Sequence, residues 1–127
     1  MTVKSLIYKQ DYIMRMINDF TRFLAKIFFN KDTVVYQLSP GENYTQTDCL
    51  HKQLLSMIQQ GKINEAENLL FQHLDTGDKK YLELALDFYQ KLNSLDDSFL
   101  EMNGFPREEI QQGLMAIAKE FGIPTFK

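Results

Sequence analysis

Polar residues recur at helical spacing through the first thirty positions. They follow one another at steps of three and four, which places them on one stripe of a helix: Asp11, Arg15, Asp19, Arg22 and Lys26. The positions between them form a wide apolar surface: Ile13, Met16, Ile17, Phe20, Phe23, Leu24, Ile27 and Phe28. A surface this wide is typical of a helix buried on more than one side. We therefore predict a long N-terminal helix within residues 1–30.

The pattern breaks over residues 31–46, which we interpret as a linker. It contains the turn signal Pro40-Gly41. Residues 33–38, TVVYQL, have β-branched character, but a lone strand without a partner would be marginal. Whether this piece is a strand stays open.

Helical signals return in residues 47–127. Thr47 or Asp48 is expected to cap a helix that runs to Gln60 and is closed by Gly61. The pair Asn64 and Glu67 suggests a capping box for a second helix that ends at Gly77. These two helices should form an antiparallel hairpin.

Three further helices complete the expected fold. Asp78 is expected to cap a helix over residues 79–93, whose few polar positions suit the centre of the core. Ser94 with Asp97 should start a shorter helix, and Pro106 suits the first turn of the last one. Gly122 and Pro124 should stop that helix. The prediction is a single all-α domain in which the long first helix packs on about five shorter helices arranged as antiparallel hairpins.

Charge is uneven along the chain. The net charge is −3, but residues 1–31 carry six Lys or Arg against two Asp, a net of +4, and the other 96 residues carry a net of −7. Charges interrupt the N-terminal apolar residues every few positions, which argues against a signal peptide or a membrane span. The single cysteine fits a reducing compartment. We therefore expect a cytoplasmic protein.

Candidate chemistry is sparse. Cys49 in the first turn of its helix could be a nucleophile, but His51 points to a different face, so we expect a small, partly buried structural cysteine. A metal site built from Cys49, His51, His73 and Asp75 lacks any recognisable ligand spacing. Adjacent carboxylates diverge by about 100° on a helix, so the pairs Asp96–Asp97 and Glu108–Glu109 cannot act as catalytic dyads. We expect no enzyme activity, no cofactor, no metal and no small-molecule substrate.

The segment GKINEAENLL, residues 61–70, resembles the hairpin junction of a tetratricopeptide repeat. Gly61, Ile63 and Ala66 match that pattern, whereas Leu54 stands where the family prefers a small residue and no proline closes the unit. We interpret residues 47–74 as a hairpin of similar shape rather than a repeat array. The whole chain, from DYIMRMI to NGFPREEIQQGL, also resembles a family of short bacterial all-helical proteins of unknown function. That resemblance implies a fold and a bacterial cytosolic setting, and no activity.

The resemblance also implies a groove. In a tetratricopeptide register, the groove-facing positions of the first hairpin helix are Asp48, His51, Leu55, Ile58 and Gln59. Exposed Leu55 and Ile58 would be costly, so we expect the N-terminal helix to cover them, from its own chain or from a second copy in a homodimer. The predicted function is protein–protein interaction or self-assembly.

The alternative is membrane or nucleic-acid association through a basic stripe made of Arg15, Arg22, Lys26 and Lys31. Asp11 and Asp19 dilute this stripe, and a pI near 5.3 is opposite to the usual footprint of a nucleic-acid-binding domain.

Overall fold

Six helices make up the regular structure of the described chain. The computed structural model describes residues 3–41 and 44–123, with side chains from Gln10 onward. The helices are α1 (Val3–Phe29), α2 (Gln46–Gln59), α3 (Ile63–His73), α4 (Lys79–Asn93), α5 (Asp97–Met102) and α6 (Arg107–Glu120). No strand occurs in these residues, so the prediction of a single all-α domain is confirmed. The predicted stop at Pro124 lies outside the described residues.

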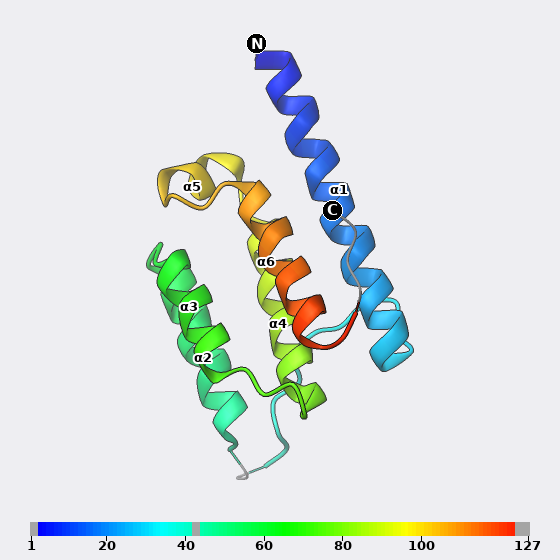
Figure 1. Ribbon diagram of the computed structural model, residues 1–127. Coiled ribbons are helices and arrows are strands. Elements are labelled where there is room, and N and C mark those ends of the chain that lie inside the picture. The colour runs from blue at the N-terminus through cyan, green and yellow to red at the C-terminus, as the bar shows by residue number, and fades with distance from the viewer. Residues whose placement is uncertain (1–2, 42–43, 124–127) are drawn as a thin grey trace.

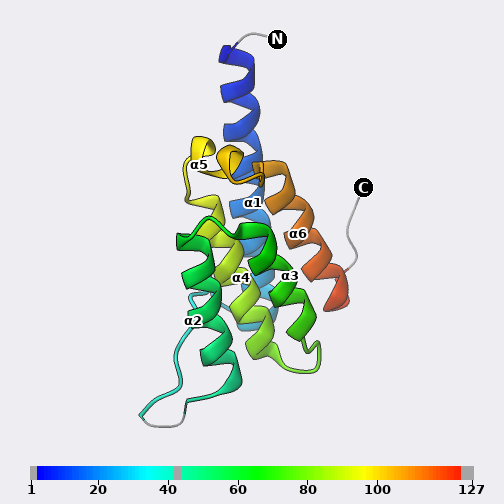
Figure 2. The same cartoon turned by 90° about the vertical axis from the view of Figure 1, so that its left-hand side faces the viewer.

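The helices form three layers. The α2–α3 hairpin lies on one side, α4 and α6 form the middle, and α1 covers the other side (Figure 1). Seen from the hairpin side, α2 and α3 lie in front of α4, and α5 crosses the end at which α4 stops and α6 starts (Figure 2). The N-terminal turns of α1 extend beyond the other helices in both views.

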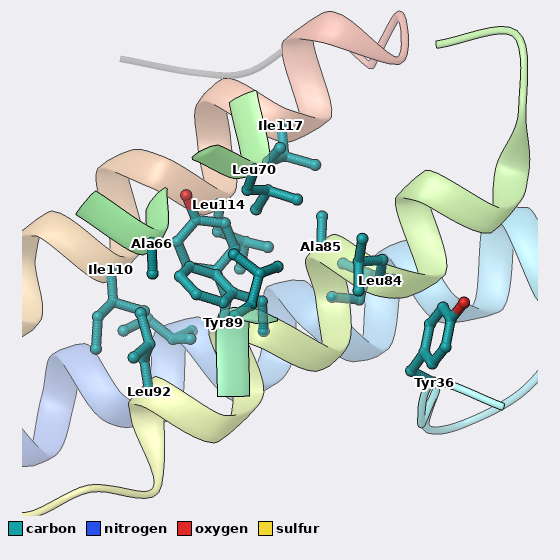
Figure 3. Close-up of a cluster of buried hydrophobic side chains, with 14 of the residues drawn as sticks. Tyr36, Ala66, Leu70, Leu84, Ala85, Tyr89, Leu92, Ile110, Leu114 and Ile117 are labelled. Atoms are coloured by element: carbon teal, nitrogen blue, oxygen red, sulfur yellow. The ribbon is translucent and has the colours of Figure 1, made fainter. Parts of the chain in front are cut away.

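Helix α4 is the centre of the core, as its sequence predicts. All six residues from 84 to 89 are buried, because α1, α2 and α6 pack around this helix. Its residues Leu84, Ala85 and Tyr89 belong to a cluster with Leu70 of α3 and Leu114 of α6 (Figure 3). Fully burying each such large apolar side chain contributes about 1.5–3 kcal/mol.

Two helix ends lie where the sequence predicts them. The carboxylate of Asp78 accepts the backbone N–H of Lys80 at 2.9 Å and so caps α4. Gly61 has φ 79°, the left-handed conformation that closes the end of α2. Pro106 precedes the first residue of α6 and occupies its N-cap position, one residue earlier than expected.

The predicted cap of α2 is wrong. Thr45 is the N-cap, and its hydroxyl accepts the N–H of Asp48 at 3.1 Å while the Asp48 carboxylate accepts the N–H of Thr45 at 3.1 Å. This is a complete capping box, in which Asp48 occupies the third helical position. Thr45 rather than Thr47 is the N-cap because only Thr45 lies three residues before an acidic side chain that can accept a hydrogen bond from its backbone N–H.

The predicted capping box of α3 is also wrong. The helix starts at Ile63, and Asn64 donates from Nδ2 to the Gly104 carbonyl at 3.2 Å. Glu67 instead accepts the Tyr89 hydroxyl at 2.6 Å, so both polar residues serve contacts with distant elements. The helix ends at His73 rather than at Gly77.

The start of α5 needs a correction as well. Ser94 closes α4 as its C-cap, and the short helix begins only at Asp97, after Asp96. A serine that donates to a carbonyl one turn back, here Lys91 at 2.7 Å, ends a helix rather than opens one.

Arg107 ties α4, α5 and α6 together, a role that no sequence pattern indicated. Its side chain is 1% exposed. The guanidinium donates to the Asn93 carbonyl at 2.6 Å, the Leu95 carbonyl at 2.8 Å and the Asp97 carboxylate at 2.7 Å. A buried charge is tolerated only when its donors are paired in this way.

The linker holds no strand in its described part. Residues 33–39, which we call the strap, run along α2 and α4 with Val34 and Tyr36 buried. The N–H of Tyr36 donates to Asp87 at 3.2 Å and that of Gln37 to Glu83 at 3.0 Å. Carboxylates of α4 therefore satisfy the backbone groups that a neighbouring strand would otherwise satisfy.

Candidate interaction surface

Helix α1 presents two apolar faces rather than one. Its first face is buried against the bundle and includes Ile13, Ile17, Thr21, Leu24 and Ala25. The second face remains in water: Tyr12 is 61% exposed, Met16 38%, Phe23 51% and Ile27 50%, and half-buried Phe20 lies at its edge. At 100° per residue these five positions fall within an arc of about 80°. We call Tyr12, Met16, Phe20, Phe23 and Ile27 the exposed stripe.

Polar contacts hold α1 in one rotation about its axis. Asn93 of α4 donates from Nδ2 to the Met14 carbonyl at 3.1 Å and to Asn18 Oδ1 at 3.0 Å. On the other side, Gln10 donates to Glu108 of α6 at 3.3 Å. Because these bonds tie α1 to both α4 and α6, they stabilise the rotation in which the exposed stripe faces away from the bundle.

The exposed stripe is partly ordered by its own contacts. The Phe20 and Phe23 rings stack with centroids 6.1 Å apart and planes 18° from parallel. Gln111 of α6 reaches Met16 Sδ at 3.9 Å, so α6 borders the stripe along one side. Ordered aromatic side chains suit a contact surface, because little rotamer freedom remains to be lost on binding.

Charged residues border the other side of the exposed stripe. Asp11, Arg15, Asp19, Arg22 and Lys26 are all exposed, and we call them the charged stripe. Lys31, the fourth member of the predicted basic stripe, is exposed just beyond the helix. The structure thus places three of the four predicted basic residues, Arg15, Arg22 and Lys26, on one stripe of α1, interleaved with two aspartates.

The predicted groove residues do not share one open surface. Asp48 and Ile58 are buried, His51 and Leu55 are half-buried, and Gln59 is exposed. His51, Leu55 and Ile58 face α4 across a cleft with no room for a water molecule. The expectation that α1 of the same chain covers this groove is wrong, because α1 packs against α4 and α6 on the far side of the bundle (Figure 1). Amphipathicity shows that a helix face is buried but not which partner buries it.

The strap occupies the end of the groove that holds Asp48. The Tyr36 hydroxyl donates to the Asp48 carboxylate at 2.7 Å, and the N–H of Ser39 donates to it at 3.3 Å. Burial by itself would raise the pKa of Asp48, but hydrogen bonds from Thr45, Tyr36 and Ser39 outweigh burial and hold that pKa below its ordinary 3.8. Burial also raises the pKa of Tyr36 to about 12.

His51 completes the anchorage of the strap. Its ring stacks on Tyr36 with centroids 4.4 Å apart, and its Nδ1 lies 3.7 Å from the Asp87 carboxylate. Burial lowers the pKa of His51, although Asp87 acts in the opposite direction. Asp48 and His51 therefore hold the chain's own strap in place.

The expectation of a partly buried Cys49 is wrong, because its side chain is exposed. It lines an open pocket of about 330 Å³ together with Gln46, Leu50, Gln53, His73 and Tyr81. His51 lies on another face of α2. Within the described residues no three His, Cys, Asp or Glu side chains gather closely enough to hold a metal ion.

The exposed stripe is the feature that sequence reasoning missed. The helical pattern groups Met16, Phe23 and Ile27 with the buried residues as one wide apolar surface. The helical angles place these residues on an arc next to that of the buried residues. Nothing in the sequence showed that the bundle covers only the buried arc and leaves this one in water.

Among the described residues, no helix combines the length and the apolar content that a bilayer crossing requires.

Comparison with known proteins places the chain in a family. Neither the curated proteins nor the solved structures gave a match, so the resemblance to a tetratricopeptide hairpin stays a prediction. A family model described as a family of unknown function, DUF6483, matches residues 7–122. The match spans α1 to α6, and the chain belongs to this family.

Proposed function

We propose that this protein is a non-catalytic module that assembles with a second copy of itself through the exposed stripe of α1. The observation that carries the proposal is the exposure of Tyr12 and Phe23 on a helix that its neighbours hold in one rotation. The largest contiguous exposed apolar patch of a folded domain is often an interaction site. We place this activity in the bacterial cytoplasm, as the family resemblance and the single cysteine suggest.

The available area supports a reversible dimer. An aromatic side chain carries about 150–250 Å², so Tyr12 and Phe23, 61% and 51% exposed, leave roughly 200 Å² in water. Covering that area on both copies contributes about 10 kcal/mol at about 25 cal/mol per Å². Association itself costs about 4–15 kcal/mol, so the net free energy is small. We expect a weak interface of the low-area class.

Light scattering across a concentration series tests the proposal. The mass should rise from 14.9 kDa toward about 30 kDa with concentration. A Phe23→Glu, Ile27→Glu variant should remain monomeric, because each new carboxylate would be desolvated in the interface. The matched control is Val35→Glu with Leu38→Glu, since Val35 and Leu38 are 57% and 53% exposed on the strap. This control should dimerise as the natural chain does, and a natural chain that stays monomeric at every concentration would refute the proposal.

A second candidate function rests on the exposure of Arg15, Arg22 and Lys26 beside the exposed stripe and of Lys31 just beyond the helix. An amphipathic helix of this kind could attach to an anionic membrane or to nucleic acid. Such binding should weaken steeply between about 50 and 200 mM salt, whereas an apolar contact should hardly change.

A further inference from the structure

We infer that two copies pair their α1 helices in antiparallel orientation, with the two-fold axis next to Phe20. This inference rests on the proposed self-assembly through the exposed stripe. It specifies which residues of the second copy meet which residues of the first.

The spacing of the apolar residues is symmetric about the middle of the stripe. Tyr12 and Ile27 are equally far in sequence from a point between residues 19 and 20, and so are Met16 and Phe23. An antiparallel pair therefore places Tyr12 on Ile27 of the second copy and Met16 on its Phe23. The two Phe20 rings meet near the axis. Every contact of the stripe is apolar on apolar over roughly 24 Å of helix.

The charged stripe supports the same orientation. A two-fold axis perpendicular to the helices sets the charged stripes of the two copies side by side and in opposite directions. Asp11 then lies opposite Lys26 of the second copy at both ends. In the same register Arg15 lies opposite Arg22 of the second copy, and the two Asp19 carboxylates lie between these four arginines and offset their repulsion. Exposed ion pairs add little affinity, but they select orientation.

A parallel pair would bring like charges together. In that arrangement the charged stripe of one copy faces α6 of the other. Three contacts show that α6 runs in the same direction as α1: Gln10 with Glu108, Met16 with Gln111, and Phe28 with Phe121. Asp11 would therefore lie at the level of Glu108 of the other copy, and Lys26 at the level of its exposed Lys119. The antiparallel pair avoids both repulsions.

The alternating signs also favour a second copy over a lipid surface. An anionic bilayer attracts a helix whose polar side is uniformly basic. Here Asp11 and Asp19 alternate with the basic residues along the same edge. This mixed edge pairs Asp11 with Lys26 of its own reversed copy at both ends, whereas an anionic bilayer would repel both Asp11 and Asp19.

Disulfide trapping tests the orientation in the full-length chain. All variants carry Cys49→Ser, because the exposed Cys49 thiol would otherwise compete. Tyr12→Cys and Ile27→Cys are prepared as two single variants, at positions 61% and 50% exposed, so the core is left intact. A disulfide needs the two Cα atoms within about 7 Å. In the antiparallel pair, position 12 of one copy meets position 27 of the other, while position 12 of the two copies is separated by roughly 22 Å along the axis.

The expected result is a cross-linked dimer when the two variants are mixed and oxidised, and no cross-link in either variant alone. Phe20→Cys should cross-link alone, because its position lies near the axis. Cross-linking of Tyr12→Cys or Ile27→Cys alone would indicate a parallel pair. That outcome overturns the antiparallel inference and leaves self-assembly through the stripe standing.

Two further outcomes bear on the inference and on the proposed function together. A dimer by light scattering that no cysteine pair traps places the interface elsewhere, which overturns the inference and the assignment of self-assembly to the exposed stripe. A concentration-independent monomer overturns both, and sedimentation with phosphatidylserine vesicles would then show whether the stripe binds lipid instead.

Discussion

Replacing Gly113 by alanine should destabilise the protein, against the ordinary preference of a helix. Gly113 lies buried within α6. In a helix interior alanine is favoured over glycine by about 1 kcal/mol, so an exposed site would gain stability. At Gly113, however, an added Cβ would clash with the Glu67 carboxylate and the Tyr89 hydroxyl, and would lie 2.7 Å from Tyr89 Cε1.

The size of the effect follows from these contacts. Overpacking of a core position costs about 1–3 kcal/mol. Displacing either partner also breaks the 2.6 Å hydrogen bond from the Tyr89 hydroxyl to Glu67, and a bond to a charged group is worth about 1.5–3 kcal/mol. After the gain of about 1 kcal/mol from helix propensity is subtracted, we expect a net loss of about 3 kcal/mol in the free energy of unfolding.

Urea unfolding followed by circular dichroism measures this loss. The matched control is Ala116→Gly, an exposed position in the same helix, which should lose about 0.5–1 kcal/mol from propensity alone. Adding Glu67→Ala to Gly113→Ala should recover part of the loss, because one of the clashing groups is then absent. A Gly113→Ala variant as stable as the natural chain, or more stable, would show that α3 and α4 do not approach α6 as closely as described.

Three more predictions concern polar residues. Arg107→Lys should reduce the free energy of unfolding, measured by urea titration, by about 2–4 kcal/mol, because a lysine ammonium cannot make the several hydrogen bonds that the buried guanidinium makes. The exposed control Arg22→Lys should change this free energy by less than about 0.5 kcal/mol. Because the pKa of Asp48 is lower in the folded state than its ordinary 3.8, ionised Asp48 stabilises the fold at pH values above 3.8. This contribution disappears as the pH falls through the folded-state pKa. The stability difference between the natural chain and Asp48→Asn should therefore shrink as the pH falls from about 5 to about 2 in urea titrations, and a difference that grows would contradict this sign. Cys49→Ser should alter the unfolding free energy by less than about 0.5 kcal/mol, and iodoacetamide should alkylate Cys49 in the native protein as fast as in urea, since the thiol is exposed.

Local signals predicted the start of α4, where Asp78 directly precedes Lys79 and caps the helix as expected. Before α2 the chain offers Thr45, Thr47 and Asp48, all competent to cap, and the choice depends on a reciprocal bond. Asn64 and Glu67 have the right spacing for a capping box, but their side chains hydrogen-bond to Gly104 and Tyr89 instead. Local pattern cannot anticipate partners that lie far along the chain.

The candidate surface was harder to predict than the fold. Periodicity assigned the apolar residues of α1 to one wide face, and only the packed bundle divides that face into a covered and an uncovered arc. The same limit applies to Arg107, whose burial no sequence pattern indicated. Its burial depends on the meeting of α4, α5 and α6 around it.

The packing of α1 against α6 has a consequence for synthesis on the ribosome. Gln10 and Glu108, which hydrogen-bond, are 98 residues apart in the chain. At about 5–20 residues per second, α1 emerges roughly 5–20 seconds before the helix that covers it. Until α4 and α6 have emerged, both apolar arcs of α1 lie in water on the growing chain, and these two helices then cover only one of them.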